Sequence, residues 1–298
     1  MTGKFKRVAV LMGGFSSERE VSLSSGAAVS RGLGEAGYEV ETVDVVDANP
    51  QLPSEAEAVF IALHGAFGED GGIQKVLDRA GIPYTGSGAQ ASSAAFNKEL
   101  SKKIFSENGI PSASYEVLGP GDSRSLPFPV VVKPVAQGSS LGVSRVFDEA
   151  GWKAAVSRAF SYGDRILVEK YIKGKELTVG VVGKKSLPLI EIVAPEEWYD
   201  YNAKYTKGIT RYLEPATVER DIAGRCRDLA LKAFQCMGCR GFGRVDFRMG
   251  VDGSLYVLEI NTIPGFTETS LLPKAAVGAG IGFAELCDMI MQSAKCDG

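Results

Sequence analysis

The 298-residue sequence has little of what disulfide frameworks and zinc sites require. It contains one histidine and five cysteines, an odd count that does not suggest a disulfide framework in a chain of this length. Cys236 and Cys239 have the spacing of half a zinc site, but no second pair and no histidine lies near them in the sequence. We interpret this pair as apolar packing at the end of a buried helix.

The sequence also lacks long apolar runs and an excess of basic charge. No stretch approaches the ~18 apolar residues of a membrane span, and the first residues lead into a predicted strand without the apolar segment of a signal peptide. The formal net charge is −3, so no basic surface for nucleic acid is indicated. We therefore expect a cytoplasmic protein that binds neither nucleic acid nor a membrane.

The first ninety residues alternate between predicted strands and helices. Apolar runs predict strands at 7–12, 38–45 and 58–63. Helices are predicted from the acidic, serine-rich segment 16–22 to about residue 36, and at 72–80. This alternation predicts a parallel sheet with helices on both faces. Glu18 and His64 each follow the end of a strand, where functional groups of such sheets gather. A dinucleotide-binding fold is poorly supported, because the first strand is not followed by the GxGxxG pattern.

A glycine- and serine-rich loop lies in the middle of the chain, after an amphipathic helix predicted over Ser92–Asn108. This loop, Gln137–Val143, separates two predicted strands, and Lys133 ends the first of them. Backbone N–H groups of such a loop, together with the lysine, can hold a phosphate. A flexible hairpin turn explains the loop equally well, since the Walker A pattern is absent.

The segment from Gly241 to Gly265 predicts a β-hairpin. Its apolar runs, Phe242–Phe247 and Leu255–Ile260, flank a turn that contains Asp252-Gly253. Because side chains alternate along a strand, Arg244, Asp246 and Arg248 share one face of the first strand. Glu259 and Asn261 likewise share a face of the second strand.

Folding about this turn brings Asp246 nearly opposite Val257–Glu259. Two neighbouring carboxylates repel each other unless something compensates their charge. Carboxylates together with an amide oxygen suit Mg²⁺. A solvated hairpin face is the alternative, but the apolar flanks and the segment Asn261–Gly265 favour a metal site.

Two further stretches have possible binding roles. The backbone of Glu169–Ile172 could border an adenine, with Glu176 accepting from ribose hydroxyls, although an ordinary hairpin would look the same. Residues Glu196–Arg211 are polar, aromatic and without periodicity, and loops of this length are often lids. A surface loop rich in tyrosine and lysine is the alternative.

These stretches together resemble the D-alanine–D-alanine ligase family of ATP-grasp enzymes, from Val8 to the last predicted helix. Several long motifs in one order are far more specific than any one motif alone. The motifs that carry the resemblance are Gly13–Gly26, Ala62–Gly71, Val132–Pro134 with Gly138–Val143, Tyr199–Tyr205, and Arg244–Phe247 with Glu259–Gly265.

The resemblance implies a fold of the α/β (α+β) class, the three-domain ATP-grasp fold. Residues 1–87 would form a Rossmann-like domain with a parallel sheet, 88–172 the central domain and 173–298 the C-terminal domain. ATP would lie between the last two domains, with two Mg²⁺ ions, for which Mn²⁺ could substitute. The resemblance also implies two D-alanine substrates and a homodimer.

The same resemblance implies roles for individual residues. The nucleotide would be bound by Lys98, Lys133, Ser140, Gly142, Glu169, Lys170, Tyr171, Ile172 and Glu176. The metal ions would be bound by Asp246, Glu259 and Asn261. Residues implied in catalysis are Glu18, Ser139, Tyr205, Arg244 and Gly265, and those implied in substrate binding are His64, Lys204, Ser270 and Leu271.

Within these groups the resemblance implies a division of labour. Glu18 would hold the amino group of the first D-alanine, and His64 would lie near its carboxylate. Arg244 and the Gly265 N–H would stabilise the tetrahedral intermediate. The carboxylate of the second substrate would be held by Ser270 and Leu271. Tyr205 would bond toward Glu18 and Ser139.

The expected activity is ATP-dependent ligation of two D-alanines through an acyl phosphate, for peptidoglycan precursors. A ligase of the same family that makes D-alanine–D-lactate or D-alanine–D-serine is the nearest alternative, and the intact Lys204-Tyr205 pair favours D-alanine. A biotin-carboxylase-like enzyme does not fit Glu18 or the Tyr199–Tyr205 motif. A non-catalytic nucleotide-binding protein would be expected to lack a metal ligand or a phosphate-binding lysine, and none is missing.

Three positions depart from the family pattern. Asn97 stands where the family usually has aspartate, so we expect a lost helix contact there without lost activity. Gln137 replaces an acidic residue of the phosphate loop. Phe266–Thr269 replaces the commoner Met-Thr-x-His beside the second-substrate site, which bears on substrate preference.

Overall fold

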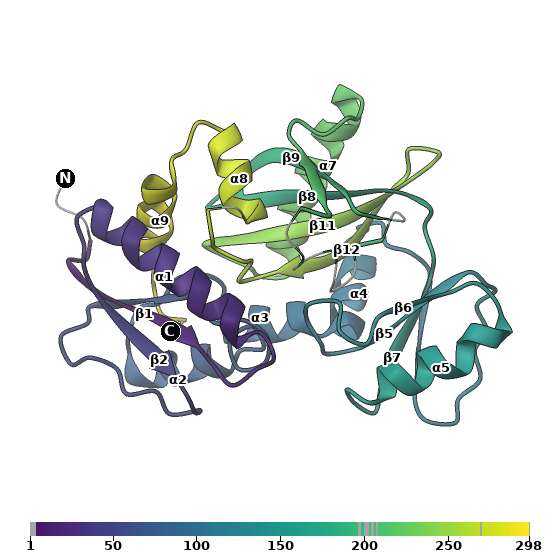
Figure 1. Ribbon diagram of the computed structural model, residues 1–298, viewed down its shortest axis with the longest axis horizontal. Helices are drawn as coiled ribbons and strands as arrows, with labels where there is room; N and C mark the ends of the chain where they lie inside the picture. Colours follow the sequence, from purple (N-terminus) through teal and green to yellow (C-terminus); the bar gives the residue numbers. More distant parts are fainter. Residues whose placement is uncertain are drawn as a thin grey trace.

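The computed structural model describes residues 4–195, 198–199, 203, 206, 208–268 and 270–297. Figure 1 shows three sheets, each with its own helices, and both chain ends near the N-terminal sheet. One sheet is parallel and two are antiparallel, so the expected mixed α/β architecture is confirmed. The domain boundaries near 87 and 172 remain predictions.

The N-terminal sheet is parallel, with strand order β2-β1-β3. Its strands are β1 (Arg7–Gly13), β2 (Glu39–Val45) and β3 (Ala58–Ile61), and its helices are α1 (Arg19–Glu35) and α2 (Gly72–Ala80). Val8–Leu11 are all buried, as expected for a strand covered on both faces. Tyr84 extends this sheet only by isolated bridges, to Val59 and to Lys295.

The helix predicted over Ser92–Asn108 is wrong as a single element. The structure has α3 (Ala89–Phe96) and α4 (Lys98–Glu107), separated at Asn97, whose backbone is extended with φ −89° and ψ 105°. The Asn97 side chain accepts a hydrogen bond of 3.1 Å from the Leu100 N–H. This N-cap satisfies an otherwise unpaired donor of α4. The helix contact that we expected to be lost is therefore present.

The four-stranded sheet is antiparallel, in the order β4-β7-β5-β6, with α5 packed on it. Its elements are β4 (Tyr115–Leu118), β5 (Val130–Pro134), β6 (Ser144–Val146), α5 (Glu149–Phe160) and β7 (Ile166–Lys170). The loop that precedes Ser144 joins β5 to β6, as predicted. A separate apolar cluster lies between this sheet and α5.

The five-stranded sheet has the order β10-β9-β8-β11-β12 and contains the predicted hairpin. Its strands are β8 (Gly174–Val182), β9 (Lys185–Val193), β10 (Arg211–Leu213), β11 (Phe242–Gly250) and β12 (Leu255–Asn261), with α7 (Arg220–Cys236) packed against them. A register shift between Asp246 and Phe247 places Asp246 opposite Glu259.

The last two helices join the C-terminal part of the chain to the N-terminal sheet. They are α8 (Leu271–Gly278), which the sequence did not predict, and α9 (Phe283–Gln292). In the described part of the chain, no single helix has the length and apolar content to cross a membrane. The pair α8 and α9, bent by 105°, meets those criteria only when taken together.

Candidate functional site

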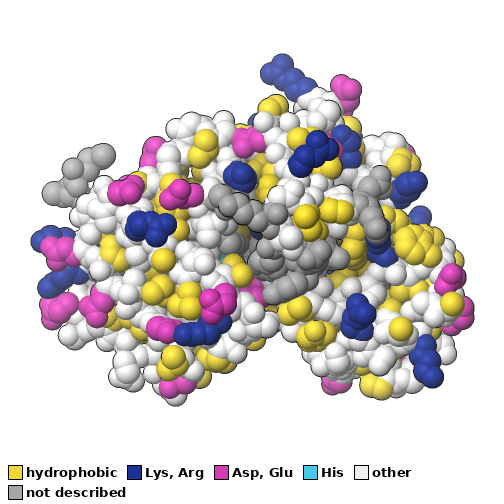
Figure 2. All heavy atoms as spheres, viewed as in Figure 1, with side chains coloured by type: hydrophobic (Ala, Val, Ile, Leu, Met, Phe, Trp, Pro, Cys, Tyr) yellow, Lys and Arg dark blue, Asp and Glu magenta, His cyan; other side chains and the backbone are white. Residues whose placement is uncertain are grey.

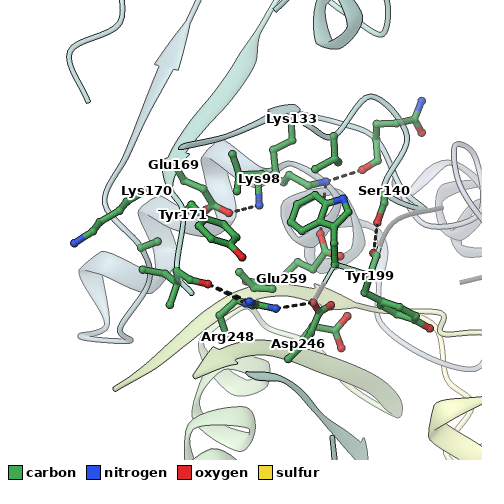
Figure 3. Close-up of a pocket in the computed structure, with 18 of the residues that line it drawn as sticks. Lys98, Lys133, Ser140, Glu169, Lys170, Tyr171, Tyr199, Asp246, Arg248 and Glu259 are labelled. Atoms are coloured by element: carbon green, nitrogen blue, oxygen red, sulfur yellow. Dashed lines mark hydrogen bonds and ion pairs between the residues drawn. The ribbon is translucent and has the colours of Figure 1, made fainter. Parts of the chain in front are cut away.

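A pocket lies between the four-stranded and five-stranded sheets, and Figure 3 shows the side chains of both sheets converging on it. Of the predicted nucleotide and metal residues, those lining it are Lys98, Lys133, Ser140, Glu169, Lys170, Tyr171, Ile172, Glu176, Asp246 and Glu259. They come from α4, β5, β7, β8, β11, β12 and the connecting loops. The chain thus assembles in space residues that lie up to about half its length apart in sequence.

The loop between β5 and β6 has a backbone that most residues avoid. Ser139 and Ser140 have φ of 50° and 57°, in the left-handed region. Gly142 also has positive φ, and a Cβ there would lie 2.7 Å from Pro134 Cγ and from a Tyr162 ring carbon. Strain of this kind persists where the surrounding structure enforces it and clusters at ligand-binding sites.

Lysines supply positive charge to one wall of the pocket. Lys98 Nζ donates a hydrogen bond of 2.6 Å to the Gln137 carbonyl and lies 3.7 Å from a carboxylate oxygen of Glu259. Lys133 forms an ion pair with Glu169. Burial opposes ionisation of Glu169, but the charges of Lys102 and Lys133 outweigh it and lower the pKa of this carboxyl to about 2. Glu169 therefore stays ionised at neutral pH.

Arg248 organises the opposite end of the pocket. Its guanidinium donates to the carbonyls of Ile172 and Gly174, at 3.1 and 2.9 Å, and to the Glu176 carboxylate at 3.1 Å. These bonds hold the segment that follows β7 in place and orient the Glu176 side chain, which lines the pocket, as Figure 3 shows in part. The sequence placed Arg248 on the correct face but did not assign it a role.

The predicted metal ligands meet on one face of the hairpin. Asp246 is directly opposite Glu259, and Asn261 Nδ2 donates to Asp246 at 2.9 Å. Asp246 is also held by Thr178 at 2.6 Å and by a two-bond ion pair with Arg244. Two carboxylates and an amide that can turn its oxygen inward form a set of hard oxygen donors. The residues present therefore fit Mg²⁺.

A second group of predicted residues lies where the loop between β5 and β6 meets the N-terminal sheet. Ser139 donates a hydrogen bond to the carboxylate of Glu18, which precedes α1. Ser16 Oγ donates to the His64 carbonyl at 2.7 Å and accepts from the Glu18 N–H at 3.2 Å. Hydrogen bonds through Ser16 thus connect the loops after β1 and β3, beside the loop between β5 and β6.

Both ring nitrogens of the buried His64 side chain have hydrogen-bond partners. Its Nδ1 lies 3.0 Å from the Ile263 carbonyl, so Nδ1 carries the proton, and Nε2 accepts from Ser25 Oγ at 3.1 Å. Ser25 Oγ in turn accepts from the Phe266 N–H. This chain connects the first sheet to the segment that contains Gly265.

The segment that precedes α8 brings the remaining predicted residues together. Ser270 Oγ accepts from the Thr267 N–H at 3.1 Å, and a Cβ on Gly265 would lie 3.2 Å from that oxygen. Leu271 begins α8 and is buried. Ser270 Oγ therefore lies close to the Gly265 backbone.

Comparison with known proteins agrees with this geometry. The chain matches the family model for the D-ala D-ala ligase C-terminus over residues 104–292 and that for the N-terminus over residues 42–87. It is 48% identical, over 97% of this chain and 96% of the relative, to the D-alanine–D-alanine ligase of Syntrophotalea carbinolica. The chain belongs to the D-alanine–D-alanine ligase family.

Solved structures of this family have the same fold. The D-alanine–D-alanine ligase of Bacillus anthracis in complex with ATP matches with a TM-score of 0.83 and 31% identity, over 97% of both chains. The VanG D-Ala:D-Ser ligase of Enterococcus faecalis matches with a TM-score of 0.86 and 26% identity, over 96% of this chain and 98% of that one. The predicted family and the ATP-grasp fold are confirmed.

Two residues with predicted roles, Lys204 and Tyr205 of the predicted lid, lie outside the part of the chain that the structure describes. Trp198 and Tyr199 are described and line the pocket, and the Tyr199 carbonyl accepts from Ser140 Oγ at 3.3 Å.

Sequence reasoning missed Glu69, which belongs to the second family motif. It accepts a 2.8 Å hydrogen bond from the Gly65 N–H. Burial and the neighbouring charge of Glu18 raise the pKa of the Glu69 carboxyl well above its usual value. Its place in that motif was a signal that could have marked it.

The burial of His64 predicts a pH-dependent stability. Burial lowers the pKa of His64, although Glu18 acts in the opposite direction. Below the unfolded value of 6.5, the unfolded chain binds a proton that the folded chain does not. The free energy of unfolding should therefore fall as pH falls below 6.5, by up to about 1.4 kcal/mol per pH unit from this group.

Urea unfolding between pH 7.5 and 5 measures this effect in the wild type and in His64→Asn. His64 is the chain's one histidine, so its replacement should flatten the slope in that window. Glu69 is present in both proteins and cancels from the difference. Equal slopes in the two proteins would contradict the prediction.

Proposed function

We propose that the protein joins two D-alanine molecules into D-alanyl-D-alanine for peptidoglycan precursors, with conversion of ATP to ADP and phosphate. The observation that carries the proposal is the bond from Ser139 to Glu18. It joins the nucleotide pocket, where a phosphoryl group would be transferred, to the loop that would hold the substrate ammonium. Family membership supports the same activity.

A carboxylate is a poor acyl donor, so the reaction needs activation. A carboxylate oxygen of the first D-alanine attacks the γ-phosphorus of ATP, the bond to ADP breaks, and an acyl phosphate forms. Phosphoryl transfer is mainly positioning plus electrostatic stabilisation. Lys98 and Lys133 supply positive charge at this wall, and the strained loop at Ser139 and Ser140 presents backbone N–H groups to the phosphates.

The second D-alanine, with its amine deprotonated, then attacks the acyl carbon, and phosphate leaves with its bonding electrons. Negative charge develops on the carbonyl oxygen. We assign its stabilisation to Arg244 and to the Gly265 N–H, an arrangement that acts as an oxyanion hole. Ser270, beside Gly265, would hold the carboxylate of this second substrate together with Leu271. Closure of the predicted lid, Glu196–Arg211, would exclude water, since water would hydrolyse the acyl phosphate.

Asp246, Glu259 and Asn261 would hold two Mg²⁺ ions, or Mn²⁺ in their place. When bound, these cations neutralise the phosphate charge. We further propose a cytoplasmic homodimer that binds neither nucleic acid nor a membrane. The net charge of −3 and the mixture of both charge signs on the face in Figure 2 support the absence of nucleic-acid binding.

The test is phosphate and ADP release from Mg²⁺-ATP with D-alanine, L-alanine, D-alanine plus D-serine, or D-alanine plus D-lactate. We expect release with D-alanine alone and D-alanyl-D-alanine among the products. Release only with D-serine or D-lactate as the acceptor would assign the chain to those ligases. Absence of release with every substrate would contradict the proposed reaction.

A further inference from the structure

A buried cluster of three charges lies behind the lysine wall of the pocket. Lys102, on α4, has a side chain that is 1% exposed, and Glu169, on β7, is 3% exposed. Lys102 Nζ lies 2.9 Å from Glu169 Oε2, and the other carboxylate oxygen pairs with Lys133. Figure 3 shows Glu169 and Lys133 pointing toward one another. Each oxygen of one carboxylate therefore faces a different lysine.

Lys102 and Lys133 differ in what else they reach. Lys133 lines the pocket, whereas Lys102 does not. Lys102 is fully buried, and its Nζ pairs with the Glu169 carboxylate, at 2.9 Å. Burial of an ammonium group is costly unless its charge is compensated. Lys102 therefore contributes to the cluster through the charge that it places beside Glu169.

The charge count of this cluster explains why a second lysine is useful. With Glu169 and Lys133 alone, the pair would be neutral, and this pair would offer little attraction to a polyanion beyond that of Lys98. With Lys102 included, two ammonium groups share one carboxylate, and the cluster keeps one net positive charge. The surplus lies at Lys133, because only Lys133 reaches the pocket.

We propose that Lys102 is a positioning residue for nucleotide binding: it neutralises Glu169, so that the positive charge of Lys133 remains available to the phosphates of ATP. The inference rests on the proposed function, because it requires that the pocket bind ATP. The inference predicts that Lys102 strengthens the binding of a ligand more as the negative charge of that ligand increases, although Lys102 does not contact the ligand.

The test is calorimetric binding of ATP, ADP, AMP and adenosine to the full-length protein and to Lys102→Met, which keeps the side-chain length and removes the charge. A unit charge about 8 Å away at an effective dielectric constant of about 20 changes binding by a factor on the order of thirty. We expect the Kd of ATP to rise ten- to thirty-fold. The Kd of adenosine should stay within about threefold of the wild-type value.

The double variant Lys102→Met/Glu169→Gln provides the matched comparison. It removes one charge of each sign and leaves Lys133 with its surplus, so the ratio of ATP to adenosine affinity should return to near the wild-type value. If Lys102→Met does not fold, Lys102→Gln replaces it, since it keeps a hydrogen-bond donor for Glu169.

A purely structural role would lower the melting temperature of Lys102→Met and leave its ATP to adenosine ratio unchanged. That result would overturn the inference, and so would a double variant with as low a ratio as the single one. Failure of the wild-type protein to bind ATP would instead contradict the proposed function.

Discussion

Glu259→Gln is expected to lose about a thousand-fold or more in the rate of ADP release while keeping its fold. If Glu259 binds a metal ion as proposed, removal of its carboxylate forfeits several kcal/mol of charge stabilisation in the transition state. Glu259 faces Asp246 across the hairpin, and its side chain is 31% exposed, so its charge is not needed to hold the core together. The measurement is steady-state ADP release with D-alanine, ATP and Mg²⁺.

Two further readings separate a lost metal ligand from a damaged fold. Titration of Mn²⁺ in the presence of ADP, followed by electron paramagnetic resonance, should show weaker binding in Glu259→Gln. Glu285→Gln, an exposed substitution of the same kind on α9, should leave both activity and Mn²⁺ binding unchanged. Activity of Glu259→Gln close to the wild-type rate would remove the metal assignment.

Glu169→Gln is expected to destabilise the fold by about 3–5 kcal/mol at neutral pH, as is usual when one partner of a buried ion pair is removed. Without the carboxylate, Lys102 and Lys133 face each other with no compensating charge in a buried place. Burial and the charge of Lys133 already favour the neutral form of Lys102, although Glu169 opposes them, and the pKa of Lys102 is lowered. Loss of Glu169 removes that opposition.

The pH dependence of this variant has a definite sign. Because the pKa of Lys102 is lowered, raising the pH removes its proton, so the penalty of Glu169→Gln should shrink as pH rises from 7 toward 10. In the wild type, the lowered pKa of Glu169 gives stability that is present above 4.5 and is lost as pH falls from 4.5 to about 2.

Guanidinium unfolding of both proteins at pH 7 and pH 9.5 provides the measurement. Glu99→Gln is the matched control, because the Arg165–Glu99 pair spans 2.7 Å but both side chains are 43–50% exposed. That control should cost no more than about 1 kcal/mol. A Glu169→Gln penalty as small as that of Glu99→Gln would show that the buried cluster is not a stabilising element.

The sequence alone determined much of this protein, because local patterns carry the information. Continuous apolar runs such as Val8–Leu11 predict buried parallel strands, and the hairpin around Asp252-Gly253 follows from two apolar runs and a turn. The family motifs supplied the predicted nucleotide and metal residues, and many of these line one pocket in the structure. The error at Asn97 was also local: the sequence pattern continues through this residue, but its extended backbone ends one helix and its side chain caps the next.

Only the tertiary structure decided how those residues meet. Phe247 pairs with Val257, so regular pairing would place the next residue, Asp246, opposite Leu258. Glu259 would then point to the opposite face of the sheet, because side chains alternate along a strand. The register shift beside Asp246 turns Glu259 to the same face, and no local pattern in the sequence marks it. The bond from Ser139 to Glu18 and the cluster around Glu169 likewise join residues far apart in sequence. Their meeting depends on the packing of separate sheets, since backbone propensity does not encode long-range contact.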